Sequence, residues 1–283
     1  MFKPHQKNNL HPITPWQIII KIFLIVYALL ILYPLIWMLM SSVKPYEQIY
    51  RSPWSLPEKW LFENYSQAWN RGIAQYFFYS VIVTAVSVLG ITVTSSLAAY
   101  GLSRFKSRIV DLVLLIIICG MMVNAQVCLV PIFRMLNAFH LLDTRWALIL
   151  PYICFRVPLT TLLLRSYFLS ISKDISESAI LDGCNEFQVY ALFYVPMSRP
   201  IMMTVVLLSS YYAWNEFLFA NIFISSEAKK TIPSGLMNFR DALKTDWGTL
   251  LAGMVIASLP MIILLMVFQK YLVRGMSEGA VKG

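Results

Sequence analysis

Residues 171–200 read ISKDISESAILDGCNEFQVYALFYVPMSRP, and the rest of the chain is organised around this stretch. It is polar, whereas the segments on either side of it are strongly apolar. Asp174 followed by Glu177 has the spacing of a capping box, with one carboxylate at the helix entry and a second one three residues later. We therefore expect a short helix that starts near Ile175.

A second short helix is expected after a turn at Gly183. Glycine adopts the left-handed conformation that ends many helices without a steric cost. The residues that follow can form a helix from about Glu186 to Phe193, before Pro196. The predicted unit is thus a helix, a glycine turn and a helix. The pattern alone leaves open that this is an ordinary loop between two membrane spans.

The composition indicates a membrane protein. Hydrophobic residues make up 58% of the 283 residues and charged residues only 13%, which is too apolar for a typical soluble domain of this size. The net charge of +9 could suggest a nucleic-acid partner. However, the basic residues are spread over short loops and form no aromatic-rich basic face. We therefore expect the positive charge to interact with membrane lipid and expect no nucleic-acid partner.

Apolar runs of roughly 20 residues are long enough to cross about 30 Å of hydrocarbon as helices. Six runs meet this criterion, near residues 16–40, 78–100, 109–130, 146–165, 200–224 and 249–271. The sequence therefore predicts an all-α integral membrane protein with six transmembrane helices. An even number of spans places both termini on the same side of the membrane.

The side on which the termini lie depends on the basic residues, which divide almost evenly between the two sets of loops. Short loops weigh most, and Arg104, Lys106 and Arg108 cluster in the shortest one, so we place that side in the cytoplasm. The expected order is a cytoplasmic N-terminal tail, a first transmembrane helix with an external loop, a core of five transmembrane helices with its polar loop, and a cytoplasmic C-terminal tail. These segments are residues 1–15, 16–76, 77–272 with the loop at 172–199, and 273–283.

Among the polar and charged side chains within the apolar runs, four are candidates for a path through the membrane: Asn124, Gln126, Arg156 and Glu216. An ionised carboxylate in hydrocarbon costs at least a few kcal/mol on insertion scales, so Glu216 is a candidate for a water-filled path through the protein. Asn124, Gln126 and Arg156 are candidates for the same path, since polar groups facing lipid are costly. Two alternatives stay open, namely an ion pair between Glu216 and Arg156 and interhelical hydrogen bonds of the two amides.

The polar loop resembles the EAA loop of ATP-binding-cassette (ABC) importer permeases, with Pro196 and Pro200 following at the expected places. In that family, this cytoplasmic loop docks as a coupling helix in a cleft of the ATPase. The resemblance implies a coupling role for residues that match the motif, which are Glu177, Ser178, Ala179, Asp182 and Gly183. Ser178 stands where the family more often has alanine.

Two further segments carry the same resemblance. Trp214-Asn215 in the fifth apolar run is similar to a family signature, and the tail 271–283 is similar to that of carbohydrate-importing permeases of the kind found as the smaller membrane subunit of the maltose system. Sugar recognition would suit Tyr211, Trp214 and Asn215, because aromatic rings and amides match the apolar faces and hydroxyls of a sugar. These aromatic side chains could instead be interfacial anchors.

The resemblance implies one permease subunit of a type I ABC importer in the cell membrane of a prokaryote. Its implied partners are a second permease subunit, two copies of an ABC ATPase subunit and an extracytoplasmic sugar-binding protein. The implied substrate is a sugar, with an oligosaccharide favoured. The identity of the sugar is left open.

Motifs for catalysis and cofactor binding are missing from the sequence. No G-x-x-x-x-G-K-[ST] loop, G-x-S-x-G elbow or H-E-x-x-H pair occurs, so we expect no enzyme activity and no cofactor. The histidines and cysteines have no metal-ligand spacing, and the cysteines are interpreted as structural thiols. A secondary transporter or channel without an ATPase partner is the alternative function, but it would need an ion site or an inverted repeat of its own. A membrane scaffold that only binds other proteins is a third possibility.

Overall fold

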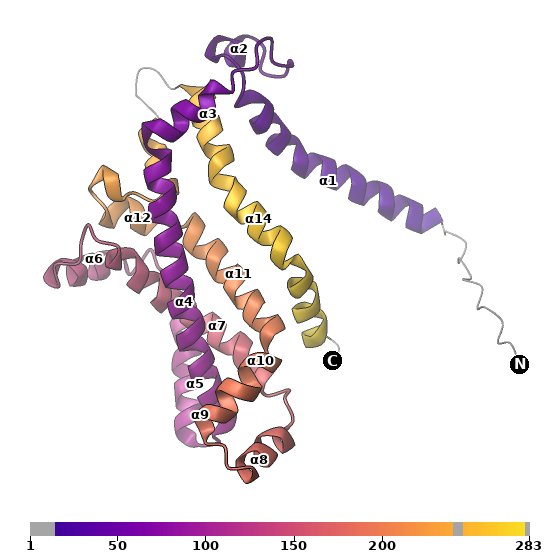
Figure 1. Cartoon of the computed structure of the whole chain (residues 1–283), viewed down its shortest axis with the longest axis vertical. Coiled ribbons are helices and arrows are strands. Elements are labelled where there is room, and N and C mark those ends of the chain that lie inside the picture. The colour runs from indigo at the N-terminus through magenta and orange to yellow at the C-terminus, as the bar shows by residue number, and fades with distance from the viewer. Residues whose placement is uncertain (1–14, 240–245, 281–283) are drawn as a thin grey trace, which may run out of the picture.

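The computed structural model describes residues 15–239 and 246–280, and all regular structure in those ranges is helical (Figure 1). The longer helices are α1 Pro15–Ser41, α4 Ala74–Arg104, α5 Arg108–Met121, α6 Leu129–Ala138, α7 Trp146–Phe168, α11 Arg199–Asn215 and α14 Trp247–Ala280. The shorter ones are α2 Tyr46–Arg51, α3 Glu63–Ala68, α8 Lys173–Leu181, α9 Glu186–Val189, α10 Val195–Met197, α12 Leu218–Phe223 and α13 Ile232–Gly235. Two π-helical turns, η1 Trp69–Ile73 and η2 Tyr190–Tyr194, and two 3₁₀ turns, η3 Glu227–Lys229 and η4 Leu236–Phe239, complete the described set.

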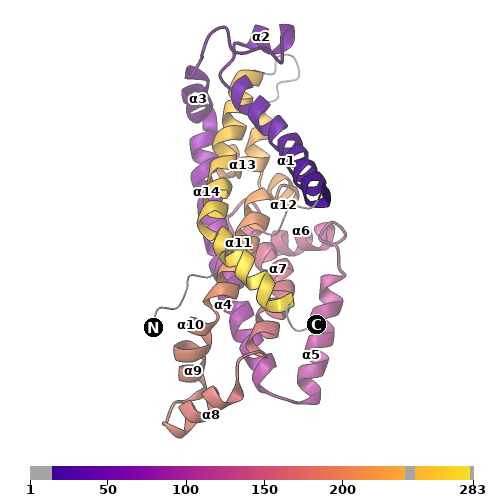
Figure 2. The ribbon, with the colours of Figure 1, turned by 90° about the vertical axis from the view of Figure 1, so that its right-hand side faces the viewer.

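The body of the molecule is an elongated bundle of α4, α7, α11 and α14 (Figures 1 and 2). Both views place α8 at one end of this bundle and α2 at the other. Helix α1 diverges from the bundle in Figure 1, and none of its apolar stretch is buried against the rest of the described chain. A helix that is apolar on all sides and unburied suits contact with hydrocarbon.

The central contact of the bundle joins α4 to α7, and small residues of α4 make it close. A Cβ atom added at Gly90 would lie 2.5 Å from Cδ1 of Ile153, so any larger residue there would force Ile153 to move. Ser95 and Ala99 are fully buried on the same helix. The Ser95 hydroxyl donates to the carbonyl of Ile91 at 2.6 Å, which satisfies it inside its own helix. Small residues of this kind allow helix backbones to approach each other in a membrane.

Four of the predicted spans are long, apolar helices. They are α1, the continuous helical stretch Glu63–Arg104, α7, and the first part of α14 up to Lys270. A fifth span is obtained if the helical stretch Glu186–Met197 and α11, which are bent by 79° at their junction, are counted as one. The four predicted runs near 16–40, 78–100, 146–165 and 249–271 match these helices closely.

The predicted third and fifth spans are wrong as continuous helices. The run 109–130 ends as a helix at Met121, and the 14 residues of α5 reach only about 21 Å at 1.5 Å per residue. The reason is local, since Asn124 accepts the amide of Gln126 on its side-chain oxygen at 2.9 Å and so stabilises a turn. The run 200–224 breaks at Glu216, which has an extended backbone between α11 and α12.

Candidate functional site

A cavity of about 610 Å³ lies among α7, the end of α11 and the start of α12. It brings together five of the residues that the sequence singled out, which are Gln126, Arg156, Tyr211, Asn215 and Glu216. The remaining lining residues are Leu208, Tyr212, Phe217 and Leu218. Residues from the α5–α6 connection, α7 and α11 therefore converge here although they are far apart in sequence.

Glu216 uses its carboxylate to join three helices at one corner of the cavity. The Tyr152 hydroxyl of α7 donates to Oε2 at 2.7 Å. The backbone amides of Phe219 and Ala220 donate to Oε1 at 2.8 Å and to Oε2 at 3.2 Å, so the carboxylate caps the first turn of α12. A negative charge at a helix N-terminus is electrostatically favourable. Glu216, the residue whose charge is unusual in an apolar run, thus stabilises the break in that run by capping α12.

Arg156 does not form the ion pair with Glu216 that the sequence left open. Within the described ranges, ion pairs join Arg71 to Asp246, Arg104 to Glu186 and Lys229 to Asp143. The Arg156 Nη2 atom donates to the carbonyl of Leu208 at 3.3 Å, and the guanidinium lies 5.5 Å from the centre of the Tyr212 ring. The buried Nε atom of Arg156 has no hydrogen-bond partner.

The other predicted path residues divide into two groups. Tyr211 is 64% exposed and lines the cavity, and Asn215 donates from Nδ2 to the Tyr211 carbonyl at 2.9 Å. Gln126 is exposed and lines the same cavity. Asn124 is exposed but is absent from the cavity lining, because its side chain closes the turn after α5.

Trp214 is not a lining residue of the polar cavity. Its side chain is only 5% exposed and packs in a cluster with Tyr76, Ile232 and Ala252. Its indole Nε1 donates to the carbonyl of Ala257 at 3.0 Å, which ties α11 to α14. Interfacial anchoring does not describe it either, since the ring is inside the chain. Trp214 is a packing residue within this chain.

The helix, glycine turn and helix predicted for the polar loop are confirmed. Helix α8 runs from Lys173 to Leu181, two residues earlier at its start than expected, and Gly183 has a φ of +87°. The expected capping box at Asp174 and Glu177 is wrong. The N-cap is Ser172, whose hydroxyl oxygen accepts the amide of Asp174 at 3.3 Å.

A true capping box begins the second helix of the loop. The Asn185 side chain accepts the amide of Gln188 at 2.9 Å, and the Gln188 side chain accepts the amide of Asn185 at 2.8 Å. The helical stretch continues through η2 to Met197, which is further than predicted, and it includes Pro196. A wider π turn just before Pro196 accommodates the proline, which has no N–H and crowds the preceding turn.

The residues that match the EAA motif lie on two different faces of α8 and its turn. Glu177, Ser178, Asp182 and Gly183 are exposed. Ala179 is only 3% exposed and packs in a cluster of the chain's own side chains that includes Val189 and Tyr194. The small size of Ala179 therefore serves packing within the chain, because a larger side chain would meet α9 and η2.

Arg104 at the end of α4 clasps the two helices of this loop. Its Nη1 donates to the Ser176 hydroxyl at 2.8 Å, and its Nε lies 3.4 Å from Oε1 of Glu186. The Tyr100 hydroxyl, one turn earlier on α4, donates to Oε2 of Glu186 at 2.6 Å. In the sequence, Arg104 indicated only topology, and this contact was not predictable, because no spacing rule joins a residue to partners more than 70 positions away.

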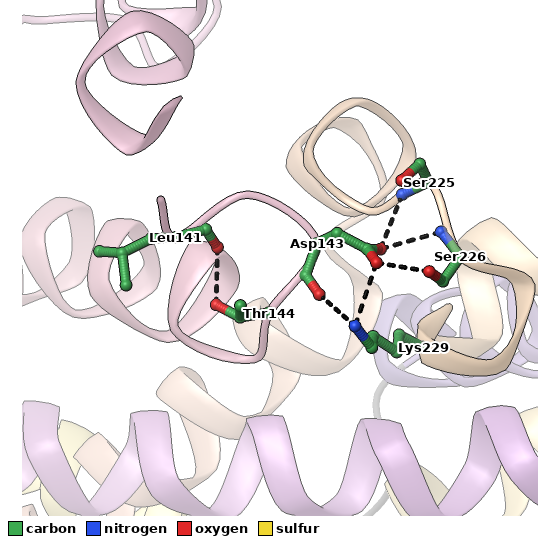
Figure 3. A network of polar contacts seen from close by, with 6 residues as sticks. All are labelled: Leu141, Asp143, Thr144, Ser225, Ser226 and Lys229. Carbon is green, nitrogen blue, oxygen red and sulfur yellow. Dashed lines mark hydrogen bonds and ion pairs between the residues drawn. The ribbon is translucent and has the colours of Figure 1, made fainter. Parts of the chain in front are cut away.

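A second clasp, built on Asp143, was also missed. Figure 3 shows its carboxylate facing Ser225, Ser226 and Lys229. The amides of Ser225 and Ser226 donate to Oδ1 at 3.1 and 2.9 Å, the Ser226 hydroxyl donates to Oδ2, and Lys229 Nζ lies 3.0 Å from Oδ2. Lys229 Nζ also donates to the Asp143 carbonyl at 2.7 Å. The contacts fasten the segment after α12 to the loop before α7.

The electrostatics of Asp143 follow from this geometry. Burial alone would raise the pKa of its carboxyl group, but hydrogen bonds from Ser226 and the ammonium group of Lys229 together hold that pKa well below the ordinary value. Asp143 also has a φ of +58°, which is uncommon for a residue with a side chain. A single acidic residue between two apolar runs was the only sequence signal that could have indicated this site.

The sequence of this chain is similar to those of known proteins. Residues 90–278 match the family described as binding-protein-dependent transport system inner membrane component. The probable ABC transporter permease protein YurM of Bacillus subtilis (strain 168) is 48% identical over 281 residues, which cover 99% of this chain and 92% of YurM. The arabinooligosaccharides transport system permease protein AraQ of the same organism is 32% identical, over 95% of this chain and 96% of AraQ.

The fold is also found in a solved structure. A chain in the crystal structure of a bacterial ABC transporter involved in the import of the acidic polysaccharide alginate superposes with a TM-score of 0.81 at 24% sequence identity. The match covers 95% of this chain and 99% of that chain. At this identity the likeness shows that the two chains share a fold.

Proposed function

The chain belongs to the family of binding-protein-dependent transport system inner membrane components, and from that premise we propose that it is one membrane subunit of an ATP-driven sugar importer. The named relatives are permease proteins, and AraQ is named for arabinooligosaccharide transport. We extend that class to this chain and favour an oligosaccharide as its substrate.

The subunit works with a second permease, two ATPase subunits and an extracytoplasmic sugar-binding protein. It lies in a cell membrane as a multi-pass protein with both termini in the cytoplasm. The cytoplasmic N-terminal tail is residues 1–15, of which 1–14 lie outside the described residues, and the C-terminal tail is residues 273–283, of which 281–283 lie outside them. Residues 16–76 contribute the first span and an external loop, and residues 77–272 contribute the permease core.

We assign six spans to this core and α1 together. Four of them are the long apolar helices, and α5 and α11 are the other two. Helix α5 is short because the chain turns at Asn124, and α11 stops at Glu216. Non-helical backbone at membrane depth is tolerated where it lines a cavity, and the residues Gln126 and Glu216 beside these two breaks both line the polar cavity.

The observation that carries the coupling role is the position of α8 to α10 at one end of the bundle (Figure 1). Glu177, Ser178 and Asp182 are exposed there, so they are available to a partner. Arg104 and Tyr100 connect the same segment to α4, which runs the length of the bundle. A push on α8 by a closing ATPase would therefore reach α4 and, through the α4–α7 contact, the wall of the polar cavity.

The experiment measures sugar uptake and ATPase retention in the purified importer reconstituted in liposomes. Glu177→Lys should reduce uptake and either release the ATPase subunits or leave ATP hydrolysis without transport, because the reversed charge faces the partner. Glu47→Lys is the matched control for ATPase retention and should leave it unchanged, since Glu47 is an exposed glutamate of a short helix, α2, at the opposite end of the bundle. Uptake that proceeds on an ion gradient with no ATPase present would instead support a secondary transporter.

A further inference from the structure

The guanidinium of Arg156 is a cation in the polar cavity that no described carboxylate neutralises. Its buried Nε has no partner, and its Nη2 has one long hydrogen bond, to the Leu208 carbonyl at 3.3 Å. Arginine keeps its charge at any physiological pH, so loss of a proton cannot relieve this position. The face of Tyr212 at 5.5 Å offers some compensation but accepts no conventional hydrogen bond.

The nearby carboxylate does not fill this role. Both oxygens of Glu216 already accept hydrogen bonds, from the Tyr152 hydroxyl and from two amides of α12. Glu216 is therefore stabilised by donors at its own corner of the cavity and leaves the Nε donor of Arg156 unpaired. The guanidinium is thus the cationic donor that the cavity offers to an incoming molecule.

We propose that this cavity binds a saccharide that carries a carboxylate, with Arg156 as the residue that pairs with the acid group. A carboxylate matches the planar fork of a guanidinium in two parallel hydrogen bonds. The exposed ring of Tyr211 supplies an apolar face for the sugar, and Gln126 supplies an amide for hydroxyls. A volume of about 610 Å³ is within the usual range for pockets that hold small organic ligands. This inference rests on the proposed function, since it names the substrate class of the same transport path.

The test measures equilibrium binding to the complete importer, with both permeases and the ATPases, in nanodiscs. The probes are a disaccharide that ends in glucuronic acid and the same disaccharide with its carboxyl group reduced to the alcohol. Omitting the sugar-binding protein removes its own selectivity from the measurement. We expect the wild-type importer to bind the acidic probe at least roughly tenfold more tightly, the scale of a charge-assisted hydrogen bond.

Substitutions of Arg156 test whether this residue is the source of the preference for the acidic probe. Arg156→Leu should abolish the preference for the acidic probe, and Arg156→Lys should keep part of it, since a lysine retains the charge but not the fork. Arg165→Leu is the matched control and should keep the full preference. Arg165 is on the same helix, is half-buried and also donates to a backbone carbonyl, that of Leu102 at 3.1 Å, but it is absent from the cavity lining.

Two outcomes would overturn the proposal. The first is equal binding of the two probes by the wild-type importer, a result that needs no variant to fold. The second is a preference for the acidic probe that survives Arg156→Leu. An importer that carries only neutral sugars refutes this inference and leaves the proposed function standing, whereas one that carries no sugar at all refutes the proposed function.

Discussion

Replacing Asp143 should loosen the segment that follows α12. Asp143→Ala removes the acceptor for the amides of Ser225 and Ser226, the hydroxyl of Ser226 and the ammonium group of Lys229 (Figure 3). The bond from the Asp143 amide to the Phe223 carbonyl at 2.9 Å remains, so the loop keeps a backbone contact. We expect local opening rather than loss of the fold.

The size of the effect follows from the contacts. Each hydrogen bond to a charged group contributes roughly 1.5–3 kcal/mol. The Asp143 side chain is 26% exposed and that of Lys229 is 45% exposed, so water replaces part of what is lost. We expect Asp143→Ala to lower the free energy of loop opening by about 3 kcal/mol, of which about 1 kcal/mol comes from placing alanine at a φ of +58°. Asp143→Asn tolerates that φ and still accepts amides, so about 1 kcal/mol is expected.

Hydrogen exchange measured by mass spectrometry on the intact importer reports this opening directly. The amides of Ser225 and Ser226 should exchange roughly a hundredfold faster in Asp143→Ala and roughly fivefold faster in Asp143→Asn. Asp246→Asn is the control, because it removes a carboxylate from a different and more exposed ion pair, with Arg71. Unchanged hydrogen exchange at Ser225 and Ser226 in Asp143→Ala would refute the conclusion that the Asp143 carboxylate holds this segment closed.

The same assay has a defined pH dependence. The pKa of Asp143 in the closed loop lies below its ordinary value of 3.8. The contribution of the carboxylate is therefore fully present above pH 3.8 and is lost as the pH falls through the lower pKa of the closed loop. Protection of Ser225 and Ser226, corrected for intrinsic exchange, should consequently be flat between pH 5 and pH 8. A decline in that interval would assign the protection to a different group.

Three further predictions concern the bundle and its polar loop. Gly183→Val should leave membrane insertion unchanged but reduce uptake, because a β-branched residue at a φ of +87° costs more than about 1 kcal/mol; normal uptake with normal ATPase retention would contradict this. Trp214→Phe removes the hydrogen bond to the Ala257 carbonyl and should lower the free energy of unfolding by about 1–2 kcal/mol, as measured by thermal unfolding in detergent. Sugar uptake per folded molecule should stay the same. Glu216→Leu should reduce uptake per inserted molecule more than abundance, because it releases the α12 cap beside the cavity, and unchanged flux would make the residue idle in transport.

Structural features that depend on neighbouring residues were predictable from the sequence. The polar loop, its two helices and the positive φ at Gly183 were all predictable, since caps and glycine turns are local. The exact N-cap was not, because Ser172 and Asp174 are both good capping residues and the local pattern does not choose between them. The long apolar helices were predictable for the same reason, whereas the breaks after α5 and α11 depend on single side chains, Asn124 and Glu216.

By itself the sequence determined that this protein is a helical membrane protein, where its polar loop lies, and which polar residues are unusual for hydrocarbon. Those properties are set by composition and by spacings of a few residues. Only the tertiary structure decided that Arg156 and Glu216 share a cavity without pairing, and that Trp214 is buried against α14. The physical reason is that a side chain's partners are chosen by helix packing across 40 or more positions, as from Trp214 to Ala257, and no local pattern specifies that packing.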